Sequence, residues 1–398
     1  MKKTVFFFFI LLAVPFSGCA TVSMPSMGES GYSLEEDERR MHKRAQEDCE
    51  ILDDSGHLYE DKKLEDYLTQ LANRLLPPDI PQESLRMEVK VIRDPLLNAF
   101  ALPNGRIYVH TGILAAAENE AQIAALLSHE MTHVINRHSL RQFRSLINKS
   151  AFFSTIEMPL AAAGGELGLI LGQLTMVSSI YGFSREMERE ADRQGFEMMR
   201  TNGYDVREAP KLFELLKQFI EDEEIKEPFF FSSHPHVVAR IKSFNDLIQE
   251  KGVSKEGEAK TGAETYTQFI RKLTLDNFQL FLEAGMFNAA KRSIGNFIEK
   301  NPESVEGYFY LGELYRQRQE KSKRRKKYDK PADYREALKA YDQALSLDPG
   351  YAAAFRGKGR VLQKQGDKTA AKEAFKQYLN LAPQADDREY IEQFSAQN

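Results

Sequence analysis

Cysteine is scarce in this sequence, with two residues, Cys19 and Cys49, in a chain of 398. A disulfide framework needs more cysteines than this, and so does a metal site built from several thiolates. The chain also lacks a large excess of either charge, because it has 54 basic and 59 acidic residues and a net charge of −5. The composition therefore gives no electrostatic reason to expect a nucleic-acid partner. With 42% hydrophobic residues, the chain is long enough for two or three packed domains.

Long hydrophobic runs are confined to two places. One is the stretch 151–183, which acidic residues, a proline and several glycines interrupt. Its longest uncharged piece, Leu167–Ser184, only reaches the lower edge of transmembrane length, so a bilayer span is the weakest interpretation. We expect either a helical flap over a functional site or a buried helical hairpin.

The other run, Val5–Phe16, follows a basic start and precedes Cys19. This order of basic, apolar and small residues is typical of a secretory signal. The residues before Cys19 resemble a bacterial lipobox, which implies cleavage before Cys19 and acylation of its thiol. Cleavage after Ala20 is the alternative and would give a soluble periplasmic protein. Because Ala20 rather than aspartate follows the cysteine, we expect a periplasmic protein anchored to the outer membrane by acylated Cys19.

A pair of histidines is the strongest chemical signal in the chain. His129 and His133 flank Glu130 in a His-Glu-x-x-His segment, and on a helix the two imidazoles share one face and can bind one metal ion. Residues 121–136 favour a core helix, because apolar residues recur at helical spacing without proline or glycine. Such a site suits zinc with a third protein ligand and a water molecule, and Glu130 is placed to act as general base. A helix with two surface histidines is the plain alternative.

A charged segment, Ser184–Gly195, carries the second half of the pattern. Glu188 and Asp192 are four residues apart, which suits a metal ligand followed by an acceptor for the N–H group of a ligand histidine. Glu190 is a weaker ligand candidate, since it does not stand four residues before the aspartate. Taken alone, the segment could be a solvated helix with Glu/Arg pairs, but the histidine motif upstream favours the metal-site interpretation.

His-Glu-x-x-His followed by Glu-x-x-x-Asp is similar to the gluzincin arrangement of peptidases. With residues 98–109 before it and His234-Pro235 after it, the order resembles the CAAX-prenyl-protease-like metallopeptidases over roughly residues 34–250. The resemblance implies an α+β, mainly helical peptidase domain with a small antiparallel sheet. It also implies one Zn²⁺ per chain and the following roles: His129, His133 and Glu188 as metal ligands, Glu130 as catalytic acid and base, and Asp192 as the group that orients a ligand histidine.

Two residues near the end of this domain have open roles. In soluble periplasmic members of the family a histidine before proline approaches the zinc and holds the enzyme inactive, so His234 is a regulatory candidate. A His-Pro turn that starts the next helix explains the same residues equally well. Arg240 is one candidate for stabilising the transition state, although no spacing singles it out. The other histidines, His138 among them, have no comparable partner in the sequence, and we expect ordinary packing or surface roles for them.

Three short strands are expected at 87–92, 100–102 and 106–109, where alternating or β-branched residues are separated by proline and Asn-Gly signals. We expect Asn98, Ala99 and Phe100 to form an edge strand beside the metal. In gluzincins such an edge pairs with extended substrate backbone, which selects unfolded chains. A strand that only packs against the metal helix is the alternative.

Beyond residue 250 the composition changes, and a polar, glycine-containing linker is expected at 251–266. Asp333–Pro349 then aligns with Asp367–Pro383 at a separation of 34 residues, the period of tetratricopeptide repeats. We expect an α-solenoid of such repeats that binds a protein partner or braces the peptidase domain. The predicted boundaries are 1–18 for the signal peptide, 19–33 for a tether, 34–250 for the peptidase, 267–385 for the repeats and 386–398 for a tail.

The middle repeat contains a basic insertion at 321–330, which is either a solvated loop or a contact for an anionic lipid or an acidic partner. A peptidase domain and repeats behind a lipoprotein signal resemble the soluble periplasmic branch of the family. This implies an envelope endopeptidase that acts on misfolded or stalled outer-membrane proteins, with the barrel-assembly machinery as a further partner of the repeats. The alternative is a periplasmic chaperone or assembly adaptor whose zinc site is structural or latent.

Overall fold

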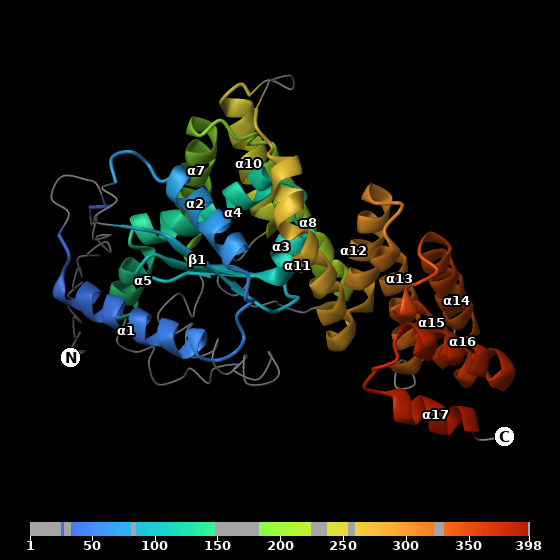
Figure 1. Ribbon diagram of the computed structural model, residues 1–398. Coiled ribbons are helices and arrows are strands. Elements are labelled where there is room, and N and C mark those ends of the chain that lie inside the picture. The colour runs from blue at the N-terminus through green and yellow to red at the C-terminus, as the bar shows by residue number, and fades with distance from the viewer. Residues whose placement is uncertain are drawn as a thin grey trace, which may run out of the picture.

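The computed structural model describes residues 25–27, 33–80, 85–147, 183–223, 237–253, 259–321 and 330–396. The predicted signal peptide, Cys19, His234, nearly all of the stretch 151–183 and most of the basic insertion lie outside these residues. Within the described ranges, no helix combines the length and the apolar character needed to cross a membrane. The described chain is mainly helical with one small sheet, as predicted (Figure 1).

The sheet consists of β1 (Glu88–Ile92), β2 (Ala99–Ala101) and β3 (Arg106–His110), with β3 in the middle. β2 pairs antiparallel with β3, whereas β1 pairs parallel with it. The prediction of an antiparallel sheet was therefore wrong for the β1–β3 pair. Alternating apolar residues locate strands without specifying their neighbours, and the connection 93–98 carries the chain past the place beside β1 that β3 later fills.

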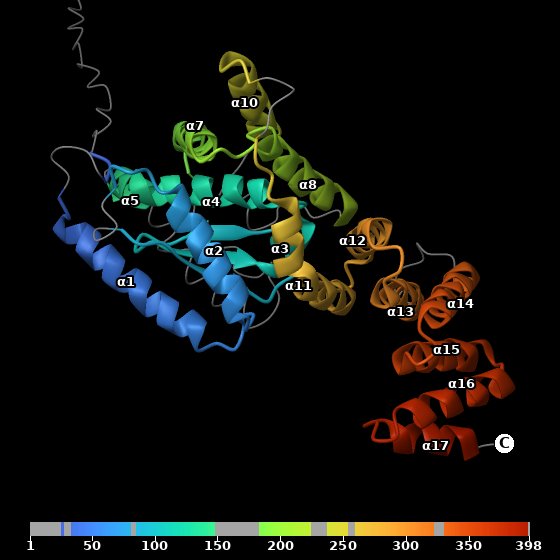
Figure 2. The ribbon, with the colours of Figure 1, turned by 45° about the horizontal axis from the view of Figure 1, so that its top comes forward.

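Each strand directs alternate side chains to the two faces of the sheet, and both faces are covered. Phe100 and Tyr108 face one side, where they pack with Ala45, Cys49 and Leu52 of α1 (Glu36–Asp53). The opposite face belongs to the main core, and its strand residues are Val89, Val91, Ala99, Ala101, Ile107 and Val109. The sheet thus separates α1 from the rest of the domain (Figure 2).

Helix α4 (Glu120–Ile135) lies on that second face, and every one of its 16 residues is buried. α7 (Arg185–Thr201) and α8 (Glu208–Glu223) pack on α4, on its side away from the sheet, and α10 (Val237–Glu250) packs on both of them (Figure 2). A helix enclosed on all sides can hold polar side chains only where they find partners, so the polar residues of α4 mark a built site. The other helices of this part are α2 (Lys62–Leu75), α3 (Thr111–Ala116) and α5 (His138–Ile147).

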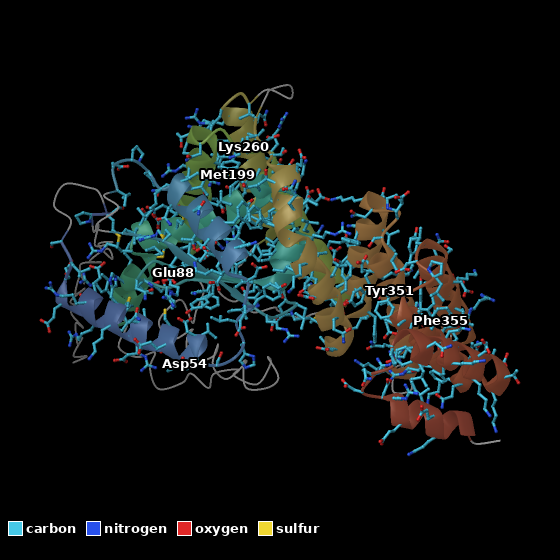
Figure 3. All side chains as sticks on the ribbon, in the orientation of Figure 1. Asp54, Glu88, Met199, Lys260, Tyr351 and Phe355 are labelled. Atoms are coloured by element: carbon cyan, nitrogen blue, oxygen red, sulfur yellow. The ribbon has the colours of Figure 1, made fainter. Side chains whose placement is uncertain are left out.

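The chain then continues into helical hairpins that extend away from the sheet (Figure 1). They comprise α11 (Ala263–Ala284), α12 (Phe287–Lys300), α13 (Val305–Lys321), α14 (Lys330–Leu347), α15 (Ala352–Gln365), α16 (Lys368–Leu381) and α17 (Arg388–Ala396). Small residues let these helices approach: a Cβ at Gly312 would lie 2.5 Å from the ring of Tyr341, and one at Gly357 only 2.4 Å from it. Tyr351 and Phe355 lie in the same array (Figure 3).

The first of these helices, α11, packs into the core of the sheet-containing part. Tyr266 donates a hydrogen bond of 2.6 Å to the carbonyl oxygen of Leu114, and Phe269 stacks on Tyr67 at 4.1 Å between ring centroids. α11 also begins within the region expected to be a linker, and Lys260 is already hydrogen-bonded to the backbone after α7, close to Met199 (Figure 3). The first three of these helices, α11 to α13, therefore share one continuous hydrophobic core with the sheet-containing part.

Candidate metal centre

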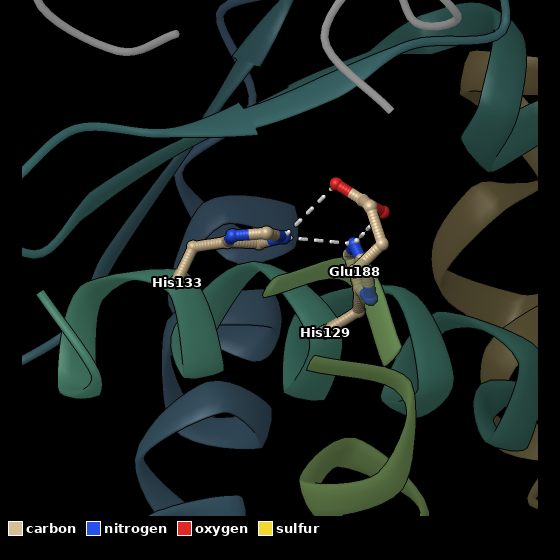
Figure 4. A group of neighbouring side chains, drawn as sticks. All are labelled: His129, His133 and Glu188. Atoms are coloured by element: carbon tan, nitrogen blue, oxygen red, sulfur yellow. Dashed lines mark hydrogen bonds and ion pairs between the residues drawn. The ribbon is translucent and has the colours of Figure 1, made fainter. Parts of the chain in front are cut away.

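The site forms where α4 and α7 cross. Ser184 caps α7 by accepting a hydrogen bond from the N–H group of Met187, and Asn119 caps α4 in the same way through Gln122. The two backbones approach closely at Gly195, where an added Cβ would lie 3.2 Å from the nitrogen of His129. This close crossing brings the carboxylate of Glu188 over the histidine pair of α4 (Figure 4).

Three side chains converge there: His129 and His133 from α4, and Glu188 from α7. The two Nε2 atoms lie 3.0 Å apart, and the carboxylate oxygens of Glu188 lie 3.5 Å from Nε2 of His129 and 3.7 Å from Nε2 of His133 (Figure 4). One ligand atom from each residue falls within 4.8 Å of the others, and all three residues are buried. Sequence spacing had selected these residues, and the fold brings them together.

This donor set fits a divalent metal ion. Two imidazole nitrogens at 3.0 Å would repel each other if both presented lone pairs to empty space, and a shared cation removes that repulsion. Two histidines and one glutamate are a known ligand set of catalytic zinc, in which the fourth position stays open for water or substrate. The residues present therefore match the metal that the sequence pattern implies.

Asp192 lies beside Nδ1 of His129, the ring nitrogen that does not face Glu188. Its Oδ1 lies 3.1 Å from Nδ1 of His129, where it can accept the Nδ1 hydrogen when Nε2 keeps its lone pair for a metal. Arg240 donates to the same carboxylate at 2.6 Å, and its Nη2 lies 2.7 Å from Nδ1 of His129. A guanidinium can only donate, so Nδ1 of His129 accepts from Arg240 when Nε2 carries the hydrogen, and it donates to Asp192 when Nε2 keeps its lone pair for a metal. The carboxylate is thus held between the ligand histidine and a buried cation.

The second histidine has a partner that the sequence analysis missed. His138 lies 2.8 Å from His133, Nδ1 to Nδ1, and its Nε2 lies 3.2 Å from Oε2 of Glu190, which also accepts from Arg141 at 3.0 Å. The hydrogen bond from His138 is the main reason why the pKa of Glu190 falls to about 2, and burial lowers the pKa of His138 itself. The expectation that His138 has no comparable partner was therefore wrong, because α4 ends at Ile135 and a residue beyond a helix end follows no helical spacing.

Glu130 lies on α4 between the two ligand histidines and is 1% exposed. β2 lies at an edge of the sheet and contacts α4. Just before β2, the carbonyl oxygen of Asn98 accepts a hydrogen bond of 3.0 Å from the N–H group of His110 at the end of β3. Ala99 faces the α4 side, whereas Phe100 faces α1.

Residues 25–27, which fall within the predicted tether, lie against the end of the metal helix. The N–H group of Met27 donates to the carbonyl oxygen of Ile135 at 3.0 Å, and Arg137 donates to the carbonyl oxygen of Pro25 at 3.2 Å. Met27 is buried and lines a small cavity whose other wall includes His133 and Ala101 of β2. This piece of the expected tether is therefore bound beside the site.

Residues 60–248 match the family model described as peptidase family M48. This segment is a peptidase family M48 domain. Two tetratricopeptide repeat models match residues 275–330 and 326–394, so the order of M48 domain and repeats predicted from the sequence is confirmed. The match also confirms the predicted metallopeptidase resemblance, and it covers the residues that form the candidate metal centre.

Curated relatives share the M48 region. The mitochondrial metalloendopeptidase OMA1 of Schizosaccharomyces pombe is 33% identical over 194 residues, which are 48% of this chain and 55% of that protein. A putative beta-barrel assembly-enhancing protease of Vibrio cholerae is 28% identical over 199 residues, 48% of this chain and 40% of that protein. The beta-barrel assembly-enhancing protease of Escherichia coli K12 is 27% identical over 169 residues, 41% of this chain and 34% of that protein. The chain thus spans about a third to about half of the length of these relatives.

Proposed function

We propose that this protein is a zinc-dependent endopeptidase of the bacterial envelope. The observation that carries the proposal is the convergence of His129, His133 and Glu188 within 4.8 Å of one another in a buried site, with Glu130 between the two histidines on the same helix. Asp192 and His138 each contact one of the two histidines, which fixes the ring orientation that a ligand needs.

When bound, zinc supplies Lewis acidity that activates water and polarises a carbonyl group. Glu130 is the base that accepts the proton of the attacking water and passes it to the leaving amine. β2 is an outer strand of the sheet, and substrate backbone in an extended conformation pairs with it at Asn98, Ala99 and Phe100. Only unfolded or flexible chains can offer such a segment, so a compact native protein is a poor substrate.

The substrates that we propose are misfolded or stalled outer-membrane proteins. Two relatives are named for enhancing beta-barrel assembly, and the signal sequence with Cys19 supports a lipid-anchored protein on the periplasmic side of the outer membrane. The repeats supply a surface for clients or for the barrel-assembly machinery.

Cleavage of an unfolded outer-membrane barrel protein by purified residues 20–398 tests this function, with the zinc content measured on the same sample. The matched control is Glu130→Gln, which removes the base and leaves every proposed ligand in place. We expect about one zinc per chain in both proteins and cleavage only by the unchanged chain. Bound zinc without cleavage, even after His234 is replaced, would instead favour a chaperone or adaptor with a latent site.

His234 is the proposed regulatory residue of this site. As a fourth donor near the zinc it would compete with water, so His234→Ala should raise peptidase activity. His236→Ala is the matched control, since it removes a neighbouring histidine on the other side of Pro235. Equal or lower activity of His234→Ala compared with that control would contradict the regulatory role.

A further inference from the structure

A separate cavity of about 240 Å³ lies where the M48 domain meets the first repeat. α3 and α8 contribute one part of its lining, and α11 and α12 contribute the other. Figure 2 shows these helices gathered at the junction between the sheet-containing part and the repeat array. None of the described residues that line the cavity belongs to the metal centre. Junctions between packed units are places where binding cavities are common.

The interior of this cavity is apolar. Phe219 of α8 and Ile270 and Phe281 of α11 are buried there, and Phe297 of α12 is partly buried. Ala115, Ala116 and Ala117, at the end of α3, also line the cavity, and their small side chains leave its space open. An apolar space of this size accommodates one large aliphatic or aromatic side chain, and burial of such a group favours binding.

The rim of the cavity is cationic. Arg292 is paired with Asp222 at 2.6 Å, and Lys300 lies 4.0 Å from Glu118. Arg271 is different, because its hydrogen bond goes to the amide oxygen of Asn301 at 3.4 Å and no carboxylate of the described residues lies within ion-pair distance of it. Three basic and two acidic residues among those that line the cavity leave one positive charge unmatched.

We infer that this cavity binds the C-terminal end of a polypeptide whose last residue is large and apolar. The terminal side chain fills the apolar interior, and the terminal carboxylate pairs with Arg271, which matches the single unpaired charge. Ser293 and Asn296 also line the cavity and offer hydrogen bonds to the backbone amides of the preceding residues. A fatty acid satisfies the charge and the apolar space but has no amides for these two side chains.

The position of the cavity relative to the metal centre gives the inference a geometric consequence. Glu118 lies at the cavity just before α4 begins, and His129 lies further along the same helix. At 1.5 Å per helical residue the two sites are about 15 Å apart along α4. An extended chain rises roughly 3.3 Å per residue, so about five residues would separate an anchored C-terminus from a cleaved bond. This consequence rests on the proposed peptidase function, whereas the binding itself does not.

Fluorescence anisotropy with a dye-labelled decapeptide tests the binding. The peptide has a glycine-serine body and ends in Leu-Phe with a free carboxylate, and it is compared with the same peptide amidated at its C-terminus. The protein is the full chain with Glu130→Gln, so that cleavage cannot remove the probe. Loss of a charge-assisted hydrogen bond should weaken binding about tenfold or more on amidation. Equal affinities for the two peptides would overturn the inference.

Three substitutions and a second ligand complete the test. Arg271→Glu should weaken binding of the free acid about tenfold or more, whereas Lys291→Glu makes the same charge change on an exposed residue outside the cavity and should leave it unchanged. Ala116→Trp fills the cavity and should abolish binding. Equal effects of the two charge reversals would contradict a local site. Binding of decanoate without binding of the peptide would assign the cavity to a fatty acid and overturn the inference.

Discussion

His138 contacts the candidate ligand His133 through their Nδ1 atoms, which lie 2.8 Å apart. If Nε2 of His133 keeps its lone pair for a metal, its Nδ1 carries the hydrogen and donates to His138. His138 can then donate from Nε2 to Glu190, 3.2 Å away. Every donor in this series meets an acceptor, and the low pKa of Glu190 keeps its end of the series anionic.

Replacement of His138 by alanine should therefore reduce zinc affinity by about tenfold to a hundredfold, the usual effect of losing a partner that orients a ligand. Competition with a chromophoric chelator measures this affinity independently of peptidase activity. His138→Gln should recover part of it, since an amide can accept from His133. His57→Ala removes a histidine that is distant from His138 in the sequence and serves as the control. Equal zinc affinities of His138→Ala and His57→Ala would refute the role of His138.

Removal of the metal should destabilise the M48 domain. The proposed ligands come from two helices, so an ion that binds only the folded chain links α4 to α7. At a free zinc concentration of about 100 times Kd, the stabilisation is roughly 2.7 kcal/mol, which for a domain of this size raises Tm by about 5 to 10 °C. Differential scanning calorimetry of the chelated and zinc-supplemented protein measures the shift. Glu188→Gln should lose most of it and Glu130→Gln should retain it, and the reverse order would contradict the ligand assignment.

Arg240 should matter for stability before it matters for catalysis. Its guanidinium lies 2.6 Å from Asp192 and 3.5 Å from Glu188, packs 4.0 Å above the ring of Phe213, and is 3% exposed. Arg240→Met would leave two buried carboxylates without their cation, which should cost about 3 kcal/mol or more in the free energy of unfolding. Urea unfolding of the metal-free protein measures this cost. Unchanged stability with a large loss of kcat would instead support the earlier hypothesis that Arg240 stabilises the transition state.

A substitution in the repeat array should lower the stability of the repeats and leave the zinc affinity of the metal centre unchanged. Gly312 of α13 has no room for a methyl group, because its Cβ would lie 2.5 Å from the ring of Tyr341. Gly312→Ala should therefore destabilise the repeats by about 1 to 3 kcal/mol through overpacking. Limited proteolysis should cut the repeats sooner, while zinc affinity stays unchanged. Gly295→Ala, at a helical glycine with open space around its Cβ position, is the matched control.

Glu120 should make stability depend on pH in the acid range. Burial alone would raise its pKa, but hydrogen bonds from Tyr204, Tyr67 and Lys260 hold that pKa below its ordinary value of 4.5. A carboxylate with a lowered folded pKa contributes stability above pH 4.5, and the contribution is lost as the pH falls through the folded pKa. Glu120→Gln should thus cost about 1 to 3 kcal/mol at pH 7 and progressively less below pH 4.5. Urea unfolding across this range measures it, with the exposed Glu118→Gln as control.

The parts of the site that follow helical spacing could be predicted from the sequence. His129 and His133 share a face because they are four residues apart, and Glu188 and Asp192 do so for the same reason on α7. The helices of the repeats follow from a period of 34 residues in the same way. In each case a local period determines which side chains lie together, so no knowledge of the tertiary structure is needed.

The rest depends on contacts between segments that the sequence does not pair. His138 meets His133 across the end of α4, where helical spacing no longer applies. β1 aligns parallel with β3 only because β2 occupies the far edge, and strand alternation is the same in either order. Phe269 shows no sign in the sequence of stacking on Tyr67, so the attachment of α11 to the M48 domain could not be foreseen from composition.

Hydrogen bonds hold Met27 and Pro25 at the end of α4, so the segment from Cys19 to Pro25 limits the distance between a lipid on Cys19 and the folded domain. Pro25 follows Cys19 by six positions, 25 − 19 = 6, and a fully extended chain over six residues reaches about 20 Å. If Cys19 carries the proposed lipid, Pro25 and the end of α4 that it contacts would stay within about that distance of the bilayer surface, whatever the orientation of the repeats. Such a peptidase would encounter substrates close to the membrane surface and would not diffuse through the rest of the periplasm.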